Sequence, residues 1–237
     1  MSTERQLMVR SKANKLVASK FKEWLGPFGF SRRGLASEAS FCRVHGDCYS
    51  GVYIDVRNHG LAVGVQPTGF MGFISAERVF SHFRDGKIVS PDDPFATGLV
   101  VDYMNLTRDP YKSCIVWQYA DEEAAVLEQL KDVVMNFILA TMEPITTPDD
   151  LIDFQVAMLS STEVFAIGRT LDVDDALRLL TLVRLHRPAI YMEVRSRVED
   201  ALSSWGALPA SAHRHLTYID QPGQLPPLPD RSAWAGV

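Results

Sequence analysis

Cysteine, histidine and aspartate side chains gather between residues 42 and 59, and together they could bind a metal ion. Thiolates, imidazoles and carboxylates are the usual ligands of zinc. The candidates in this stretch are Cys42, His45, Asp47, Cys48 and His59. Structural zinc sites pair ligands about two to four residues apart, whereas five residues separate Cys42 from Cys48. We therefore expect small buried thiols and turn histidines here, and no metal ion or other cofactor.

Three pairs of adjacent aspartates could serve as metal ligands or as a general acid and base. They are Asp92 with Asp93, Asp149 with Asp150, and Asp174 with Asp175. Neighbouring residues on a helix point about 100° apart, so such a pair does not converge on one ion. Aspartates also favour the first turn of a helix, where backbone N–H groups lack partners. We expect the last two pairs to start helices and the first pair to lie in a loop.

Nucleophilic catalysis would need a serine or cysteine beside a base, and no Gly-x-Ser-x-Gly or cysteine-protease pattern is present. The glycines match neither the P-loop nor the dinucleotide-binding fingerprint. Cys114 falls in residues 113–119, a predicted strand in which a buried and inert thiol is expected. Gly69 and Gly72 are expected to mark a bend. The sequence therefore identifies no catalytic residue.

Charge is distributed unevenly along the 237 residues, whose formal net charge is −5. Residues 1–34 carry eight Lys or Arg and two Glu, a net charge of +6. Residues 121–175 carry thirteen acidic and two basic side chains, a net charge of −11. An acidic surface built from this window could steer a basic partner towards the protein.

The basic side chains of the first segment could instead bind nucleic acid by neutralising phosphates. The candidates on the basic face of the first helix and in the arginine pair after it are Arg5, Lys12, Lys15, Lys20, Lys22, Arg32 and Arg33. No stacking aromatic residues alternate with them, and the chain as a whole is acidic. Such lysines more often form a solvated helix face, so we do not expect a nucleic-acid partner. An RNA-binding accessory module remains an alternative.

An amphipathic helix is predicted over residues 13–25. Its apolar residues recur at helical spacing and share one side of the helix. They are Ala13, Leu16, Val17, Phe21, Trp24 and Leu25. The helix is expected to end at Gly26 and Pro27, because the residue before a proline is pushed out of helical geometry.

Strict alternation of apolar and polar residues then predicts two half-buried strands, residues 52–57 and 61–66. Apolar side chains face each other across this pair only if the connection has an even length, such as a two-residue turn at His59 and Gly60. Residues 41–45 are expected to add a preceding strand through a turn at Gly46 and Asp47. The three strands would form a meander.

Helices dominate the rest of the chain. Residues 75–83 predict a short helix, and Asp121 is placed to cap a long helix whose apolar stripe runs from Val126 to Ile138. Thr147 and Pro148 signal another helix start, and further helices are predicted after Asp172 and after Pro188. The Pro-rich end of the chain predicts extended, polyproline-like structure.

These elements define an α+β fold: an N-terminal helix, an antiparallel β-meander and a long helix packed on the sheet, followed by a C-terminal helical extension. We expect an α+β domain over residues 1–146, a helical subdomain over residues 147–208 and a Pro-rich tail over residues 209–237. The sequence shows no apolar signal region, no apolar run of membrane-spanning length and no Cys-x-x-Cys pair. A cytoplasmic protein without a membrane partner is expected, and its oligomeric state stays open.

The corner LGPFGFSRRG and the segments IVWQY and PITTPDDL, in this order, resemble a family of uncharacterised bacterial α+β domains. Members of that family occur among the immunity proteins of polymorphic-toxin and contact-dependent inhibition systems. The residues that match are Leu25, Phe28, Gly29, Phe30 and Arg32 at the family's Leu-x-x-x-Gly-Phe-x-Arg-like corner, its strand tryptophan Trp117, and Pro144 and Pro148 before its last helix. The chain departs from the family in a longer loop over residues 84–112 and in its helical extension.

The resemblance and the acidic window together predict a non-enzymatic protein that binds another protein, such as an immunity protein that neutralises a basic toxin domain. Nuclease toxins bind polyanions, so a carboxylate-rich surface could occupy the same basic cleft. The candidate partner-binding residues are Asp149, Asp150, Asp153, Asp172, Asp174 and Asp175. Helix capping or solvation would also explain each of them.

An enzyme is the alternative. A hydrolase or nucleotide-processing site could assemble on the polar face of the β-meander from Tyr53, Asp55, Arg57 and Gln66. A pocket that holds Asp55 with a perturbed pKa would favour this alternative.

Overall fold

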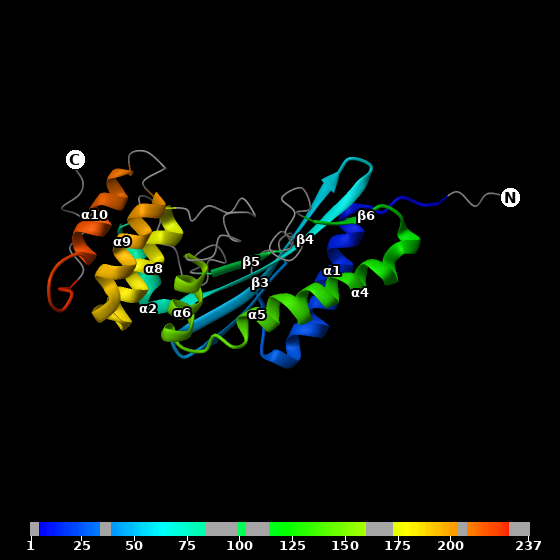
Figure 1. Ribbon diagram of the computed structural model, residues 1–237. Coiled ribbons are helices and arrows are strands. Elements are labelled where there is room, and N and C mark those ends of the chain that lie inside the picture. Colours follow the sequence, from blue (N-terminus) through cyan, green and yellow to red (C-terminus); the bar gives the residue numbers. More distant parts are fainter. Residues whose placement is uncertain are drawn as a thin grey trace. The chain divides into compact units, whose positions relative to one another are not determined.

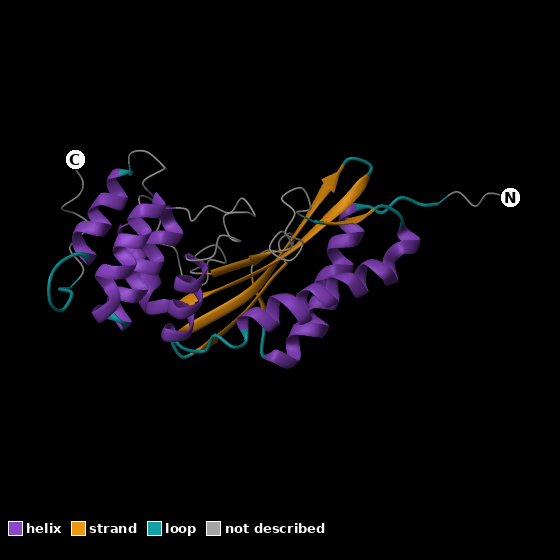
Figure 2. Cartoon of the chain, viewed as in Figure 1, coloured by secondary structure: helices purple, strands orange, loops and turns teal. Residues whose placement is uncertain are grey.

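The computed structural model describes residues 5–33, 39–83, 99–102, 114–159, 173–202 and 208–227. The chain forms an antiparallel sheet of meander order with helices before and after it, so the predicted α+β class is confirmed (Figures 1 and 2). It divides into two compact units, residues 1–71 with 100–146 and residues 72–99 with 147–237. The second unit resumes at residue 147, where we placed the helical subdomain, but it also includes residues 72–99.

Helix α1, Arg10–Leu25, buries four members of the predicted apolar stripe, Ala13, Val17, Phe21 and Leu25, which are inaccessible to solvent. The other two, Leu16 and Trp24, are partly buried. It ends in the short 3-10 helix η1, Gly26–Phe28, as the Gly-Pro pair predicted. The chain then turns through Gly29 at φ +80°, a backbone region that residues with a side chain rarely adopt. A three-residue strand that we did not predict, β1 (Ser31–Arg33), follows the corner.

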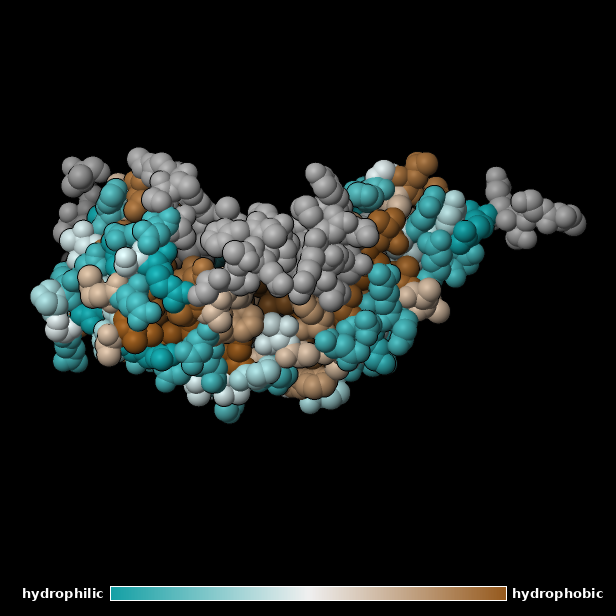
Figure 3. Space-filling view, in the orientation of Figure 1, coloured by the Kyte–Doolittle hydropathy of each residue, from teal (hydrophilic) through white to brown (hydrophobic). Residues whose placement is uncertain are grey.

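The meander consists of β2 (Ala39–His45), β3 (Cys48–His59) and β4 (Ala62–Phe73), and the strand order is β1-β2-β3-β4-β5. Strands β3 and β4 are each twelve residues long, roughly twice the predicted length. Their connection is the pair Gly60 and Leu61, so the predicted even length is confirmed one position later in the chain. Leu61 is 78% exposed at this tip, and the tip is hydrophobic in Figure 3.

Two further strands lie on the other side of β4. They are β5 (Leu99–Asp102) and β6 (Ile115–Trp117), the latter shorter than the predicted strand over residues 113–119. Val63 of β4 lies opposite Trp117, which is inaccessible to solvent, and Val65 lies opposite Ile115. The strand tryptophan is therefore a core residue of the first unit.

The predicted long helix is confirmed as a rod of four segments that lies beside α1 on the same face of the sheet (Figure 1). The segments are the 3-10 helix η2 (Ala120–Glu122), α4 (Glu123–Asp132), the π-helical η3 (Val133–Leu139) and α5 (Ala140–Met142). The prediction that Asp121 caps this helix is wrong. Asp121 lies inside η2, and the Glu122 carboxylate instead accepts the backbone N–H of Tyr119 at 3.0 Å and of Gln118 at 3.1 Å.

We predicted that Gly69 lies in a bend. The structure instead places it inside β4. A Cβ atom at Gly69 would come within 2.3 Å of Ile138 Cγ2 and 3.1 Å of Met142 Sδ. The helical rod therefore packs directly on the backbone of β4, and glycine is required there because no side chain fits.

The second unit is helical. Its elements are α2 (Ile74–Phe83), α6 (Pro148–Leu159), α8 (Val173–His186), η4 (Pro188–Ile190), α9 (Tyr191–Leu202) and α10 (Ala210–Ile219). Helix α8 contacts α2, α6, α9 and α10, and all of residues 176–183 are buried. It is therefore the central helix of this unit, as expected for a helix whose middle turns carry mainly apolar residues.

Helix α10 lies in the range that we assigned to a Pro-rich tail, residues 209–237, so that assignment needs correction. Its buried positions Ala212, His215, Leu216 and Ile219 do recur at helical spacing. The histidine interrupts the apolar stripe and prolines follow, which hid the helix. The predicted helices at residues 75–83, 147 onward and after Pro188 are confirmed as α2, α6 and α9.

We expect the substitution Gly69→Ala to lower the free energy of unfolding by about 1–3 kcal/mol, because the added methyl group forces Ile138 and Met142 away from the sheet. Urea denaturation measures this change. Gly26→Ala is the matched control, since a Cβ at Gly26 meets nothing within 4 Å. Equal stability of the two variants would show that the rod does not press on Gly69.

Candidate functional site

Helix α6 begins with a reciprocal capping interaction that fixes the position of its first carboxylates. The Asp150 N–H donates to Thr147 Oγ1 at 3.2 Å, and the Thr147 N–H donates to Asp150 Oδ2 at 2.8 Å. Pro148 occupies the first helical position, where its missing N–H has no cost. The helix start predicted from these residues is confirmed, and Asp150 is engaged in it.

Asp149 and Asp153 lie four residues apart on α6, so they share one face of the helix. Arg187, which follows α8, binds both: its Nε atom is 3.8 Å from Asp149 Oδ1, and its Nη1 atom forms an ion pair with Asp153. The two carboxylate side chains remain 65% and 71% exposed, whereas the Arg187 side chain is 33% exposed. We call Asp149, Asp153 and Arg187 the α6 clamp.

The other acidic candidates do not join the α6 clamp. Asp174 and Asp175 lie in the first turn of α8, whereas Arg187 lies just beyond its last residue. A rise of 1.5 Å per residue separates the two ends by about 20 Å along the helix. Asp175 Oδ1 lies 3.7 Å from Arg178 Nη1 in the same helix. Asp172, like Asp92 and Asp93, lies outside the described residues.

The second unit contains a buried ion pair that we did not predict from the sequence. Arg178 of α8 and Glu77 of α2 are 6% and 5% exposed, and Arg178 Nε lies 3.0 Å from Glu77 Oε1. The guanidinium also lies over the ring of Phe80, 4.1 Å from its centroid. An arginine within the largely apolar run of residues 176–183 was the available signal, because a buried arginine needs a carboxylate partner.

The polar residues of the alternative site lie on strands β3 and β4. Tyr53, Asp55 and Arg57 alternate along β3 and therefore share a face, and Asp55 forms an ion pair with Arg57. The hydrogen bond that Arg57 donates to Asp55 is the main cause of the raised pKa of Arg57, and electrostatic interactions with Asp55, Cys114 and Tyr53 add to it. Three of the four residues are thus brought together, while Gln66 lies on the neighbouring strand.

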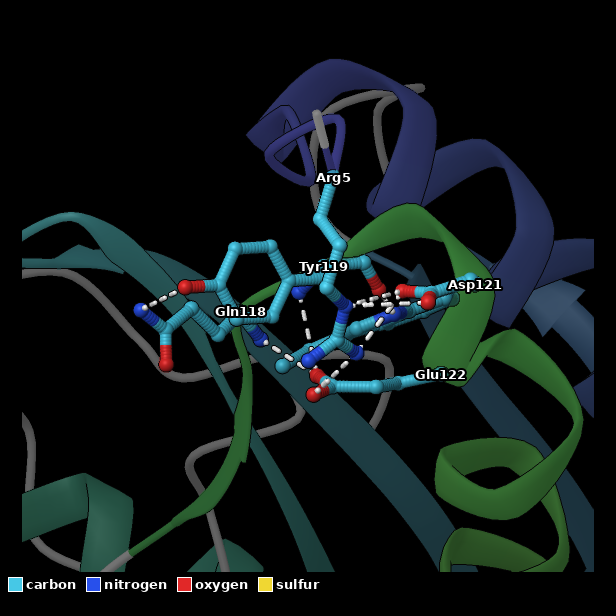
Figure 4. A network of polar contacts seen from close by, with 6 residues as sticks. Arg5, Gln118, Tyr119, Asp121 and Glu122 are labelled. Atoms are coloured by element: carbon cyan, nitrogen blue, oxygen red, sulfur yellow. Dashed lines mark hydrogen bonds and ion pairs between the residues drawn. The ribbon is translucent and has the colours of Figure 1, made fainter. Parts of the chain in front are cut away.

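Arg5 belongs to a polar network that fastens the N-terminal segment to the start of the helical rod (Figure 4). The guanidinium donates to Asp121 Oδ1 at 2.9 Å and to Glu122 Oε1 at 3.1 Å, and it lies 3.9 Å from the Tyr119 ring centroid. Its hydrogen bonds lower the pKa of the Asp121 carboxyl. Backbone bonds from Met8 to Gln118 and from Ala120 to Gln6 extend the contact. The first cation of the basic segment is therefore engaged within the chain.

The metal candidates occupy the β2–β3 hairpin. Cys42 lies opposite Gly51, His45 lies opposite Cys48, and burial raises the pKa of the Cys48 thiol. Within the described part of the chain, no three His, Cys, Asp or Glu side chains are grouped so that they could hold a metal ion.

Comparisons of the chain with models of protein families, with curated proteins and with solved structures found no match. Of the helices that the structure describes, none has the length and apolar character needed to cross a lipid bilayer.

We expect Arg178→Ala to lower the free energy of unfolding by about 3–5 kcal/mol, because it leaves the Glu77 carboxylate in the core without its cation. The double variant Glu77→Gln with Arg178→Met removes both charges and should be less destabilised. Urea denaturation compares them. Lys20→Ala, which breaks the exposed pair with Glu23, is the control and should cost less than about 1 kcal/mol. Equal losses in the single and double variants would contradict this account of the pair.

Proposed function

We propose that the protein is a non-enzymatic binding protein that contacts a basic protein partner through the carboxylates of α6. The observation that supports this proposal is the α6 clamp, in which two exposed carboxylates share one guanidinium. An ionised carboxylate has about four acceptor sites, so the pair can accept further hydrogen bonds from an arginine or lysine of a partner.

The α6 clamp is held on a rigid element. The capping interaction of Thr147 and Asp150 fixes the first turn, and Leu151 and Ile152 anchor α6 in the core of the second unit. A preformed carboxylate pair loses little conformational entropy on binding, so more of its interaction energy contributes to affinity.

Neutralisation of a basic toxin domain is the concrete form of this proposal, and it follows from the resemblance of the chain to immunity-associated domains. A toxin that cleaves nucleic acid carries a basic cleft, which an acidic surface can occupy. The protein would then act in the cytoplasm of a bacterium, where such a toxin meets its target. The partner to test is the product of a gene that flanks its own, because immunity proteins are encoded beside their toxins.

We expect the double substitution Asp149→Asn with Asp153→Asn to weaken binding of that partner about tenfold or more, mainly through a slower association rate. Biolayer interferometry at about 0.05 M and about 0.5 M salt measures the association and dissociation rates and shows how far salt screens the attraction between the partners. The wild-type protein should lose affinity with added salt more steeply than the variant.

The matched control is Glu128→Gln with Asp132→Asn, which removes the same charge from exposed positions of α4. This variant should bind as the wild-type protein does. If both double variants bind equally well, or if no flanking gene product binds, the proposal is wrong.

Arg187→Ala has the opposite expected effect, because it removes a cation that competes with a partner's cation for the carboxylates of the α6 clamp. We expect two- to tenfold tighter binding, approximately, in the same measurement. The free energy of unfolding should fall by less than about 1 kcal/mol, since exposed ion pairs contribute little. Weaker binding would instead indicate that Arg187 orients the carboxylates.

An enzyme on the polar face of the sheet is the second candidate, and the grouping of Tyr53, Asp55, Arg57 and Cys114 favours it. This group would act on a small substrate rather than on a protein surface. Loss of a hydrolase activity in Asp55→Asn, with partner binding intact, would support this candidate over the first.

A further inference from the structure

His215 of α10 is a buried histidine enclosed by two other helices. It is 1% exposed, and its ring stacks on Phe83 of α2 with 5.1 Å between centroids and 13° between planes. Phe80 of α2 packs against a second side of the ring at 5.9 Å. The Nε2 atom of His215 lies 2.8 Å from Thr181 Oγ1 of α8. The imidazole therefore joins α10 to both α2 and α8.

The hydrogen bonds of Thr181 determine which nitrogen of His215 carries the proton. Thr181 Oγ1 donates its one hydrogen to the Leu177 carbonyl at 2.7 Å, so it can only accept from His215. The proton is therefore on Nε2, and Nδ1 has a bare lone pair. Nδ1 has no hydrogen-bond partner in the described part of the protein.

A second proton on His215 would place an N–H group and a positive charge among aromatic rings. Burial lowers the pKa of His215 to about 4, well below its ordinary value of 6.5. The helices packed against α10 carry these ionisable groups: Glu77, Arg78 and His82 on α2, and Asp174, Asp175, Arg178, Arg184 and His186 on α8. Arg178 lies over Phe80 and binds Glu77, so a cation adjoins the aromatic side chains around His215 and opposes a second positive charge.

The end of α10 is held by polar contacts of a different kind. Arg184 donates to the Ile219 carbonyl at 2.9 Å and to the Gln221 carbonyl at 2.6 Å. Asp220, just after the helix, binds Arg195 at 3.3 Å and accepts a hydrogen bond from Tyr191. Asp220 is an ionisable group at this end of α10, so an experiment must separate its contribution from that of His215.

We propose that α10 is an acid-released cover of the second unit, in which protonation of His215 frees α10 from α2 and α8 and exposes Phe80 and Phe83. The released state can hydrate both ring nitrogens, whereas the closed state offers Nδ1 no partner.

The sign of the pH dependence follows from the two pKa values. Between pH 6.5 and 4 the released state binds the proton and the closed state does not, so the closed state loses stability as the pH falls through this window. The ratio of released to closed molecules should rise about tenfold per pH unit, and about 300-fold over the whole window. Below pH 4 both states are protonated, and His215 contributes no further change.

Two measurements on the full chain test the proposal. NMR titration of the histidine Cε1–H resonances should show one histidine that remains neutral well below pH 6. Hydrogen exchange of the α10 amides, corrected for intrinsic rates, should lose protection about tenfold per pH unit between pH 6.5 and 4. Protection that stays constant over this range, or a His215 that titrates near its ordinary pKa, would overturn the proposal.

Variants assign the effect to the residue. His215→Gln keeps a donor for Thr181 but does not titrate, so α10 should retain its protection in acid. His213→Gln changes an exposed histidine of the same helix and should behave as the wild-type protein. Asp220→Asn should lower the protection of the α10 amides at every pH without changing how steeply this protection depends on pH.

If this pH dependence disappears in Asp220→Asn and persists in His215→Gln, the carboxylate and not the imidazole is the sensor, and the proposal is wrong. The wild-type titration decides the question if His215→Gln does not fold.

Discussion

The burial of one face of the sheet is the constraint on which the first unit depends. Val52, Ile54 and Val56 point to the same side of β3 and are buried there. A slip of one residue in strand pairing would turn all three to the opposite face, so the hydrophobic effect fixes the register. The even connection at Gly60 and Leu61 satisfies this requirement. Tyr53, Asp55 and Arg57 then align on the other face as a geometric consequence, whether or not they have a function.

The elements that could be predicted from sequence are those whose signals are local. The stripe of α1, the corner at Gly26 and the cap of α6 each depend on residues a few positions apart. Features that depend on distant residues could not be found. Gly69 looked like a bend because Ile138 and Met142, which exclude a side chain there, lie about seventy residues away. Asp121 looked like a cap because Arg5, its partner, is 116 residues distant.

The candidate site follows the same division. Asp149 and Asp153 were among the predicted partner-binding residues, but nothing local indicated Arg187, 34 residues from Asp153. Asp174 and Asp175 belong to the same acidic window of the sequence and lie at the far end of α8 from the α6 clamp. Asp149 and Asp153 are close in sequence and also in space. Asp174 and Asp175 are kept away from them because α8 runs from its acidic first turn to Arg187 at its other end. A charged window becomes a charged surface only where the helix axes bring its members together.

The second unit uses ionisable groups in two environments, and desolvation decides what each can do. At the start of α6 the two carboxylates keep most of their hydration, so a partner cation can replace Arg187 for less than about 1 kcal/mol. Between α2, α8 and α10 the groups have lost their water, so Arg178 is tied to Glu77, and His215 remains neutral. Exposed ion pairs can be exchanged without unfolding, whereas buried groups fix which helices pack together. For this reason a binding surface on α6 and an acid response at α10 can coexist in one small helical unit. Binding through the carboxylates of α6 depends on the salt concentration, whereas the packing of His215 depends on the pH.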